Sequence, residues 1–284
     1  MTKPRLILID GSSLEHRAFH ALPEMTAPSG LPSNAVFGYT RMLKNILEEY
    51  EPDYIAAAFD LPGKTFRSER YDEYKSNRTK PADELIAQKP YIRKITEALG
   101  VRVLQLSGWE ADDIIGTLAE AAGKEGLDTL IITSDKDMLQ LVNDKVLVKQ
   151  EHMKASKVYD EDAVKERYGV PPNKMIEIMG LMGDSSDNIP GAPGIGEKTA
   201  IELIKQYGDI KGVYEHIDEI TGPKRRQALL ENREQVELSR WLATIRTDAP
   251  LDVRLEDLRR TSPDTDVLTQ YFTELNFRSL LSGL

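Results

Sequence analysis

The first half of the chain alternates short apolar runs with longer segments in which apolar residues recur every three or four positions. The runs occupy residues 6–9, 54–59, 101–106 and 129–133 and are rich in β-branched side chains, which is typical of buried strands. Residues 34–50 have helical spacing. A second helix is predicted from Ala111, with Ile114 and Leu118 on its buried side.

This alternation predicts an α/β fold. Because strands and helices succeed one another, we expect a largely parallel twisted sheet flanked by helices, and ligands of such sheets bind beyond the carboxyl ends of the strands. After Tyr159 the strand pattern fades and the chain becomes helical, with loops rich in glycine and proline. The sequence therefore predicts an α/β core over residues 1–170 and a smaller helical subdomain over residues 171–284, with the boundary between 160 and 175.

The composition limits the class of protein. The 284 residues include no cysteine, so a disulfide framework and a cysteine-based metal site are excluded. Asp10 interrupts the first apolar run far short of a membrane span. We expect a monomeric intracellular protein without a membrane partner.

The charge at first argues against nucleic acid, because DNA affinity comes mainly from Lys and Arg that neutralise phosphates and the formal net charge is −10. The basic residues are concentrated, however. Between residues 61 and 82, six basic side chains stand against three acidic ones. The basic ones are Lys64, Arg67, Arg70, Lys75, Arg78 and Lys80. This local excess permits a DNA partner.

Nine acidic residues form the clearest candidate site, and most of them follow the predicted strands. They are Asp10, Asp60, Glu110, Asp112, Asp113, Asp135, Asp137, Asp184 and Asp187. Taken singly, each could be a helix cap, a turn residue or a charge at a helix N-terminus. Together they would repel, by about 4 kcal/mol for two charges about 4 Å apart, so a cation is needed. On the same ground, Asn at Asp184 or Asp187 should leave the metal-free protein as stable as the parent or more so.

Oxygen ligands favour Mg²⁺ or Mn²⁺. Two such ions about 4 Å apart would activate a water and stabilise the leaving oxygen when a phosphodiester is hydrolysed. His16 and His20 are expected to be unpaired and to serve packing or hydrogen bonding, not metal binding.

A glycine-rich turn follows the last acidic pair. In residues 191–200, Gly194, Ile195 and Gly196 precede a predicted helix, with Lys198 and Thr199 beside its start. Small residues let backbone amides approach a phosphate, and a helix N-terminus favours the negative charge. The alternative is an ordinary turn between two helices.

These motifs together resemble the 5′-nuclease domain of bacterial DNA polymerase I, a relative of flap endonucleases. The resemblance covers nearly the whole chain and rests on residues 8–14, 17–19, 21–23, 71–78, 110–113, 134–140 and 183–200. It implies a PIN-like core in which all nine acidic residues form the metal site. It also implies a C-terminal helix-three-turn-helix that binds duplex DNA, often with K⁺ in its hairpin.

The resemblance further implies a flexible helical arch over the active site, here residues 61–90 (the arch segment). Tyr74, Lys75 and Arg78 would face the scissile phosphate, and Arg67 would contact DNA nearby. Glu15, His16 and Trp109 depart from the residues usual in the family, so their roles stay open.

The function expected is a 5′-3′ exonuclease and 5′-flap endonuclease that acts on branched, flapped or nicked DNA with two or more metal ions in a bacterial cytoplasm. Polymerase domains would belong to the same chain if this is an excised domain. Two alternatives stay open: a DNA-binding module with an inactive site, and a phosphatase of small substrates. The basic stretch and the hairpin argue against the phosphatase.

Overall fold

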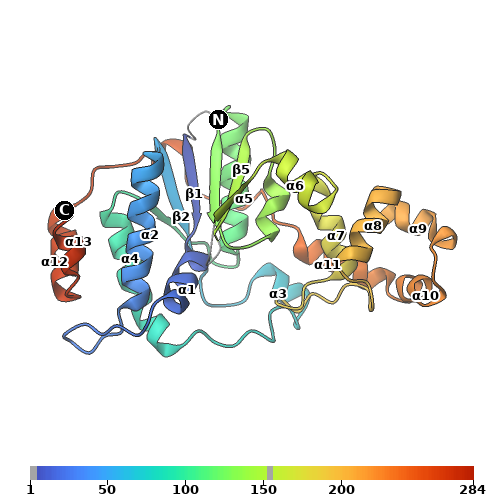
Figure 1. Cartoon of the computed structure of the whole chain (residues 1–284), viewed down its shortest axis with the longest axis horizontal. Coiled ribbons are helices and arrows are strands. Elements are labelled where there is room, and N and C mark those ends of the chain that lie inside the picture. The colour runs from blue at the N-terminus through green and yellow to red at the C-terminus, as the bar shows by residue number, and fades with distance from the viewer. Residues whose placement is uncertain (1–4, 152–155) are drawn as a thin grey trace.

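The computed structural model describes residues 5–151 and 156–284 and has a six-stranded sheet at its centre (Figure 1). The strand order is β3-β2-β1-β4-β5-β6, and only β6 is antiparallel to its neighbour. The strands are β1 Leu6–Asp10, β2 Tyr54–Ala58, β3 Arg102–Leu104, β4 Thr129–Thr133, β5 Val146–Glu151 and β6 Ser156–Tyr159. The predicted α/β class and the four predicted strands are confirmed.

The sequence pattern missed β5 and β6. Strand β5 ends in the polar residues Lys149, Gln150 and Glu151, and β6 is exposed at all positions except Tyr159. Strand β6 is the antiparallel edge of the sheet, where a strand can face water on one side, whereas β5 lies between β4 and β6 and buries the polar side chains of Lys149 and Gln150. Neither therefore shows the continuous apolar run of a central parallel strand.

Helices cover both faces of the sheet. One hydrophobic cluster joins Ile7 and Ile9 of β1 to α1, α2, α4 and α12, and the other joins Leu6 and Leu8 to α5, α7 and α8. The helices are α1 Gly11–Ala21, α2 Asn34–Tyr50, α3 Phe66–Arg70, α4 Asp83–Ala98, α5 Ala111–Lys124, α6 Glu161–Tyr168, α7 Met175–Met182, α8 Glu197–Tyr207, α9 Ile210–Glu215, α10 Pro223–Glu231, α11 Arg233–Ala243, α12 Thr265–Glu274 and α13 Arg278–Leu281. Short 3-10 turns cover Asp137–Leu141, Pro172–Lys174, Ile217–Glu219 and Leu255–Leu258.

The arch segment passes below the carboxyl ends of the strands (Figure 1), but it is mostly not helical. Only α3 and the first turns of α4 are helical within residues 61–90. Lys75 has a left-handed φ of 56°, and its amide donates to the Asp187 carbonyl at 2.8 Å. Contacts with the rim of the sheet, rather than helical hydrogen bonds, fix the chain here, so the expected helical arch is wrong for this part.

The C-terminal helices return to the core. Leu268 and Phe272 of α12 are fully buried in the same cluster as Ile7 and Ile9 of β1. Residues 171–284 therefore do not pack as one unit, and a domain boundary at residue 170 remains a prediction. Within the described residues, no helix is both long and apolar enough to cross a membrane.

Candidate metal centre and nucleic-acid interface

The carboxyl end of β1 brings Asp10 to the rim of the sheet. Asp10 caps α1 by accepting a hydrogen bond from the Ser13 amide at 2.9 Å, and it accepts another from the Thr133 hydroxyl at 2.7 Å. A Cβ on the next residue, Gly11, would lie 2.2 Å from the Phe59 ring. Glycine therefore allows the tight start of α1 that holds the Asp10 carboxylate in place.

The neighbouring strand ends hold Asp60 and Asp135 in a similar way. Asp60 accepts a hydrogen bond from the amide of Ala111, the first residue of α5, at 2.9 Å. Asp135 accepts one from the Asp137 amide at 2.9 Å. Because parallel strands end at one edge, these local bonds bring the carboxylates together, as the sequence predicted.

Burial and mutual repulsion perturb these carboxyls. Burial, reinforced by the charges of Asp60 and Asp135, raises the pKa of Asp10 to about 7. Burial and then neighbouring carboxylates raise the pKa values of Asp112 and Asp137 well above the usual range. Asp137 Oδ1 is buried without a hydrogen-bond partner, and in the described part of the chain Asp112 forms no hydrogen bond or ion pair. Lys75 and Lys136 lower the pKa values of Asp112 and Asp137 only in part, and neither carboxylate forms an ion pair among the described residues.

The arch segment supplies cations to other members of the acidic set. Lys75 Nζ lies 2.5 Å from Glu110 Oε1 and 3.7 Å from Asp187, and Arg78 pairs with the other oxygen of Asp187. The Tyr74 hydroxyl donates to Glu110 at 3.0 Å. Burial opposes ionisation of Glu110, but Lys75 and then Arg67 hold its pKa below the usual value. The predicted catalytic residues Tyr74, Lys75 and Arg78 therefore contact two of the predicted metal ligands, Glu110 and Asp187.

Lys136 pairs with Asp184 at 3.2 Å and was missed by the sequence reasoning. Burial raises the pKa of Asp184, but the Ser186 hydroxyl and Lys136 outweigh it and hold that pKa below the usual value. The sequence feature that could have indicated a role for Lys136 is its position between two acidic residues, Asp135 and Asp137.

No three His, Asp or Glu side chains in the described ranges converge closely enough to hold one metal ion. Lys75, Arg78 and Lys136 pair with three of the carboxylates, Glu110, Asp187 and Asp184. The donor set nevertheless fits divalent cations. It consists of carboxylates, which hard ions prefer, and it includes the unpartnered Asp137 Oδ1.

Arg67 does not face DNA in this structure. Its side chain is buried, and all five of its N–H groups are used: they bind Asp113 twice at 2.8 Å, Glu110 at 2.9 Å, and the carbonyls of Leu242 and Thr244 at 2.8 Å. The expected DNA contact of Arg67 is therefore wrong here.

Asp113 is not placed as a metal ligand either. Besides Arg67, its two oxygens accept hydrogen bonds from the amides of Glu110 and Arg246. The capping position of Asp113 at the start of α5 explains this: the third residue of a helix can reach back to the N-cap amide. Asp113 positions Glu110 and Arg67.

Three further residues differ from expectation or were left open. Glu15 is buried and pairs with Lys89 at 2.8 Å and Arg93 at 2.5 Å, so it presents no free charge to a substrate. The Nε2 atoms of His16 and His20 lie 3.2 Å apart, so the expectation of unpaired histidines is wrong. Residues four apart on a helix face one another.

The predicted phosphate-binding turn lies before α8. Gly194 has a φ of +78°, which glycine favours, and Gly196 is the N-cap of α8. Neither would meet another atom within 4 Å through a Cβ, and Lys198 is exposed. Ile195, by contrast, is buried and anchors the turn. The turn thus presents its glycine backbone outward, as the DNA-binding prediction requires.

Two family models match the chain. They are the 5′-3′ exonuclease N-terminal resolvase-like domain, over residues 5–169, and the 5′-3′ exonuclease C-terminal SAM fold, over residues 170–266. DNA polymerase I of Bacillus caldotenax is 43% identical over 284 residues, and that of Bacillus subtilis (strain 168) is 42% identical over 284. Each match covers 99% of this chain but 32% of the relative, so the chain spans about a third of the length of these relatives.

Solved structures share the fold at lower identity. The bacteriophage T5 5′-exonuclease with bound zinc has a TM-score of 0.69 at 21% identity and covers 97% of this chain and 98% of its own. The catalytic core of Rad2 in complex with DNA substrate has a TM-score of 0.65 at 18% identity, with coverage of 96% and 88%. The predicted PIN-like core with a helical C-terminal part is confirmed. The family models and the polymerase relatives, which span the whole acidic rim, show that this chain belongs to the 5′-3′ exonuclease family.

Proposed function

We propose that this chain hydrolyses phosphodiester bonds of DNA near a free 5′ end, as a structure-specific 5′-3′ exonuclease and 5′-flap endonuclease. The observation that carries the proposal is the acidic rim, in which Asp10 and Asp112 lie near Asp60 and Asp135, Asp137 lies near Asp135 and Asp184, and Asp137 Oδ1 is buried without a partner. Such a cluster is unfavourable by itself and is suited to divalent cations.

Two or more Mg²⁺ or Mn²⁺ ions are proposed to bind the rim. The ligands would come from Asp10, Asp60, Glu110, Asp112, Asp135, Asp137, Asp184 and Asp187. When bound, such ions supply an activated water and offset the charge that develops on the phosphodiester oxygens. The T5 5′-exonuclease, which shares the fold, has been solved with divalent metal ions (zinc) bound, which supports this assignment.

The cations of the arch segment then change partners. Once the carboxylates are neutralised, Lys75 and Arg78 are free to leave Glu110 and Asp187 and to contact the scissile phosphate. Fixed cations aimed at developing charge are among the strongest contributions to catalysis. Tyr74, buried beside Glu110, would orient that ligand and support the end of the substrate.

Duplex DNA is proposed to bind at Gly194, Ile195, Gly196, Lys198 and Thr199, with K⁺ in the same hairpin. The outward glycine backbone and the start of α8 favour a phosphate there. We further propose that the protein acts as a monomer on branched, 5′-flap and nicked DNA in the bacterial cytoplasm, and that polymerase domains follow in a longer parent chain. The relatives, which are about three times as long, support the last point.

The test compares three reactions of the purified chain: a 5′-flap duplex with Mg²⁺, the same duplex with EDTA, and a small phosphate ester with Mg²⁺. Cleavage of the flap duplex alone, and only with Mg²⁺, is expected. The absence of any three-carboxylate grouping among the described residues favours the alternative of a DNA-binding module. Tight binding of the flap duplex without cleavage in Mg²⁺ or Mn²⁺ would establish that alternative.

A further inference from the structure

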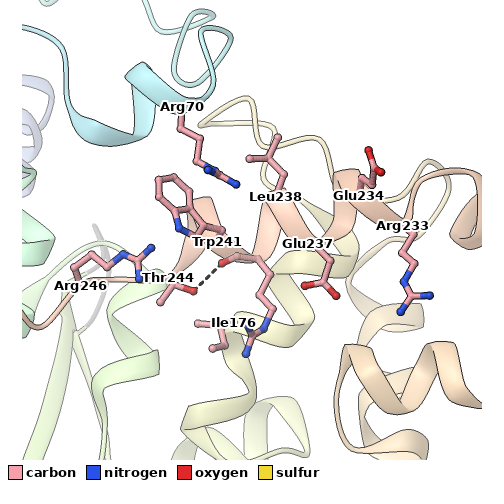
Figure 2. Close-up of a pocket in the computed structure, with 10 residues that line it drawn as sticks. Arg70, Ile176, Arg233, Glu234, Glu237, Leu238, Trp241, Thr244 and Arg246 are labelled. Carbon is pink, nitrogen blue, oxygen red and sulfur yellow. Dashed lines mark hydrogen bonds between the residues drawn. The ribbon is translucent and has the colours of Figure 1, made fainter.

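A row of three aromatic rings lies beside the acidic rim. The ring centroid of Phe66 is 5.0 Å from that of Trp109 and 5.7 Å from that of Trp241. All three side chains are partly exposed. Trp109 directly precedes Glu110, so one end of the row adjoins the rim. The other end opens into a cavity of about 690 Å³ lined by Trp241 (Figure 2).

Two arginines flank Trp241 at this cavity. The guanidinium carbons of Arg70 and Arg246 lie 4.9 Å and 5.1 Å from the centroid of the Trp241 ring. Figure 2 shows Arg70 reaching from α3 toward the ring, with Arg246 on the other side in this view. Over residues 5–151 and 156–284, neither side chain forms an ion pair or a hydrogen bond. Their charges are therefore available to a ligand.

The rest of the cavity is closer to neutral. Arg240 pairs with Glu177 at 2.8 Å, and Glu234 and Glu237 lie along α11 away from Arg246 (Figure 2). Arg233, a third arginine of the cavity, also forms no ion pair or hydrogen bond among the described residues, but it lies at the other end with Glu234 and Glu237, whose two carboxylates outnumber it (Figure 2). The net positive charge is thus concentrated around Trp241, at the end nearest the aromatic row.

Hydrogen bonds join this surface to the acidic rim. The Arg246 amide donates to Asp113 at 2.9 Å, and Arg67, one helical turn before Arg70, donates to the Thr244 carbonyl at 2.8 Å and to Glu110 at 2.9 Å. Both free arginines therefore stand on segments fixed to the residues that hold Glu110. A strand that leaves the rim past Trp109 would meet Phe66, then Trp241 and the two arginines.

We propose that Trp109, Phe66 and Trp241, with Arg70 and Arg246, form a path that binds a single-stranded segment of the DNA substrate. The proposal rests on the proposed function and adds a place where the strand is held, not cut. Bases stack on aromatic rings and guanidinium planes with little regard to sequence, while guanidinium groups also contact phosphates. The carboxylates of Glu234 and Glu237 would repel phosphates and end the path inside the cavity.

Fluorescence tests the path directly, because the only two tryptophans of the chain both belong to it. In the Trp109→Phe variant, Trp241 is the sole reporter. Titration with oligo(dT) in Ca²⁺ should change its emission in a saturable, salt-dependent manner, whereas a blunt duplex should not. Unchanged emission with oligo(dT), under conditions in which the parent cleaves a 5′ flap in Mg²⁺, would overturn the path and leave the proposed function intact.

Affinity measurements give a second, independent readout. The double variant Arg70→Ala and Arg246→Ala removes two phosphate contacts on a single strand, so the slope of log affinity against log salt should become shallower by about 1.4. Trp241→Ala should weaken binding about 5- to 150-fold, and Trp241→Phe should retain most of the affinity. Lys124→Ala is the control, because it removes a charge at the far end of α5, about 20 Å from Glu110.

Substrate choice identifies the strand. If the double variant loses affinity only for 5′-flap duplexes, the path binds the flap. If it loses affinity only for gapped duplexes, the path binds the exposed template strand. An equal penalty on a fully paired duplex, or none on any substrate, overturns the single-strand assignment. A parent that cleaves no DNA in Mg²⁺ would instead refute the proposed function.

Discussion

Replacing Asp112 by Asn should stabilise the metal-free protein while it abolishes cleavage. Asp112 is the cleanest position for this test, because its carboxylate forms no hydrogen bond or ion pair among the described residues. Burial and then Asp10 and Asp135 raise its pKa well above the usual value. Its charge therefore opposes folding when no cation is bound, and Asn removes the charge with little change of size.

Asp10 gives the scale of such an effect, because its pKa rises from 3.8 to about 7. At pH 8 that rise destabilises the fold by about 4 kcal/mol, because one pKa unit corresponds to about 1.4 kcal/mol. A buried amide without partners costs about 2 kcal/mol. Burial and neighbouring carboxylates raise the pKa of Asp112 in the same direction, so Asp112→Asn should raise the Tm in EDTA.

Thermal unfolding at pH 8, in EDTA and again in excess Mg²⁺, measures this effect. The gain should vanish in Mg²⁺, because a cation that binds only the folded parent stabilises it by mass action. Asp187→Asn is the matched contrast: it breaks the contacts with Arg78 and Lys75 and should lose about 1 kcal/mol or more in EDTA. The reasoning would be refuted by an Asp112→Asn protein that is less stable than the parent in EDTA.

The remaining predictions concern the arch segment, the hairpin and the buried arginine. Lys75→Ala should slow single-turnover cleavage about 100- to 1000-fold with little loss of duplex affinity, and equal losses in both would contradict its role. Gly194→Val should weaken flap-DNA binding in Ca²⁺, because a β-branched residue is strained at φ +78°, whereas Gly196→Ala should have a smaller effect; equal affinity of Gly194→Val and parent would make the turn structural only. Arg67→Lys should lower the Tm by several degrees, since one ammonium cannot replace five N–H contacts; an unchanged Tm would show that those contacts are dispensable.

The acidic rim could be predicted because it follows from local rules. The strands that end at Asp10, Asp60 and Asp135 are central and apolar, so their pattern is plain, and parallel strands must end at one edge. Strands β5 and β6 carry no such pattern, because β5 buries the polar side chains of Lys149 and Gln150 and β6 is exposed except at Tyr159. Hydrophobic periodicity detects strands that bury apolar side chains, and it fails at these two.

The partners of the acidic residues could not be predicted, because they come from distant parts of the chain. Arg78 and Asp187 are 109 residues apart, and Arg67 and Asp113 are 46 apart. For this reason the sequence pattern indicated Asp184 and Asp187 as two more repelling charges, whereas the structure pairs both with cations, and we now expect Asn at these positions to destabilise the metal-free protein. The pairing of His16 with His20 was accessible, since it follows from a spacing of four on α1.

The same electrostatics fixes how the stability of the metal-free protein depends on pH. The folded-state pKa of Asp10 is raised to about 7, and those of Asp112, Asp135 and Asp137 are raised as well. The folded state therefore binds more protons than the unfolded chain. The stabilising contribution of these groups is fully present below about pH 4, and it is lost as the pH rises toward about 7.

Glu110 and Asp184, whose pKa values are lowered, act oppositely but only near and below about pH 4.5. Burial also lowers the pKa of His16, which opposes the trend below about pH 6.5, but it is one group against four raised carboxyls, which therefore dominate the range from pH 5.5 to 8. In EDTA the Tm should fall across that range, and Mg²⁺ should bind more tightly at the upper end because the ligands must lose protons. Scans at both pH values, with proton release recorded during Mg²⁺ titration, test the sign. A Tm in EDTA that rises from pH 5.5 to 8 would show that the rim carboxylates are already neutralised by the cations around them.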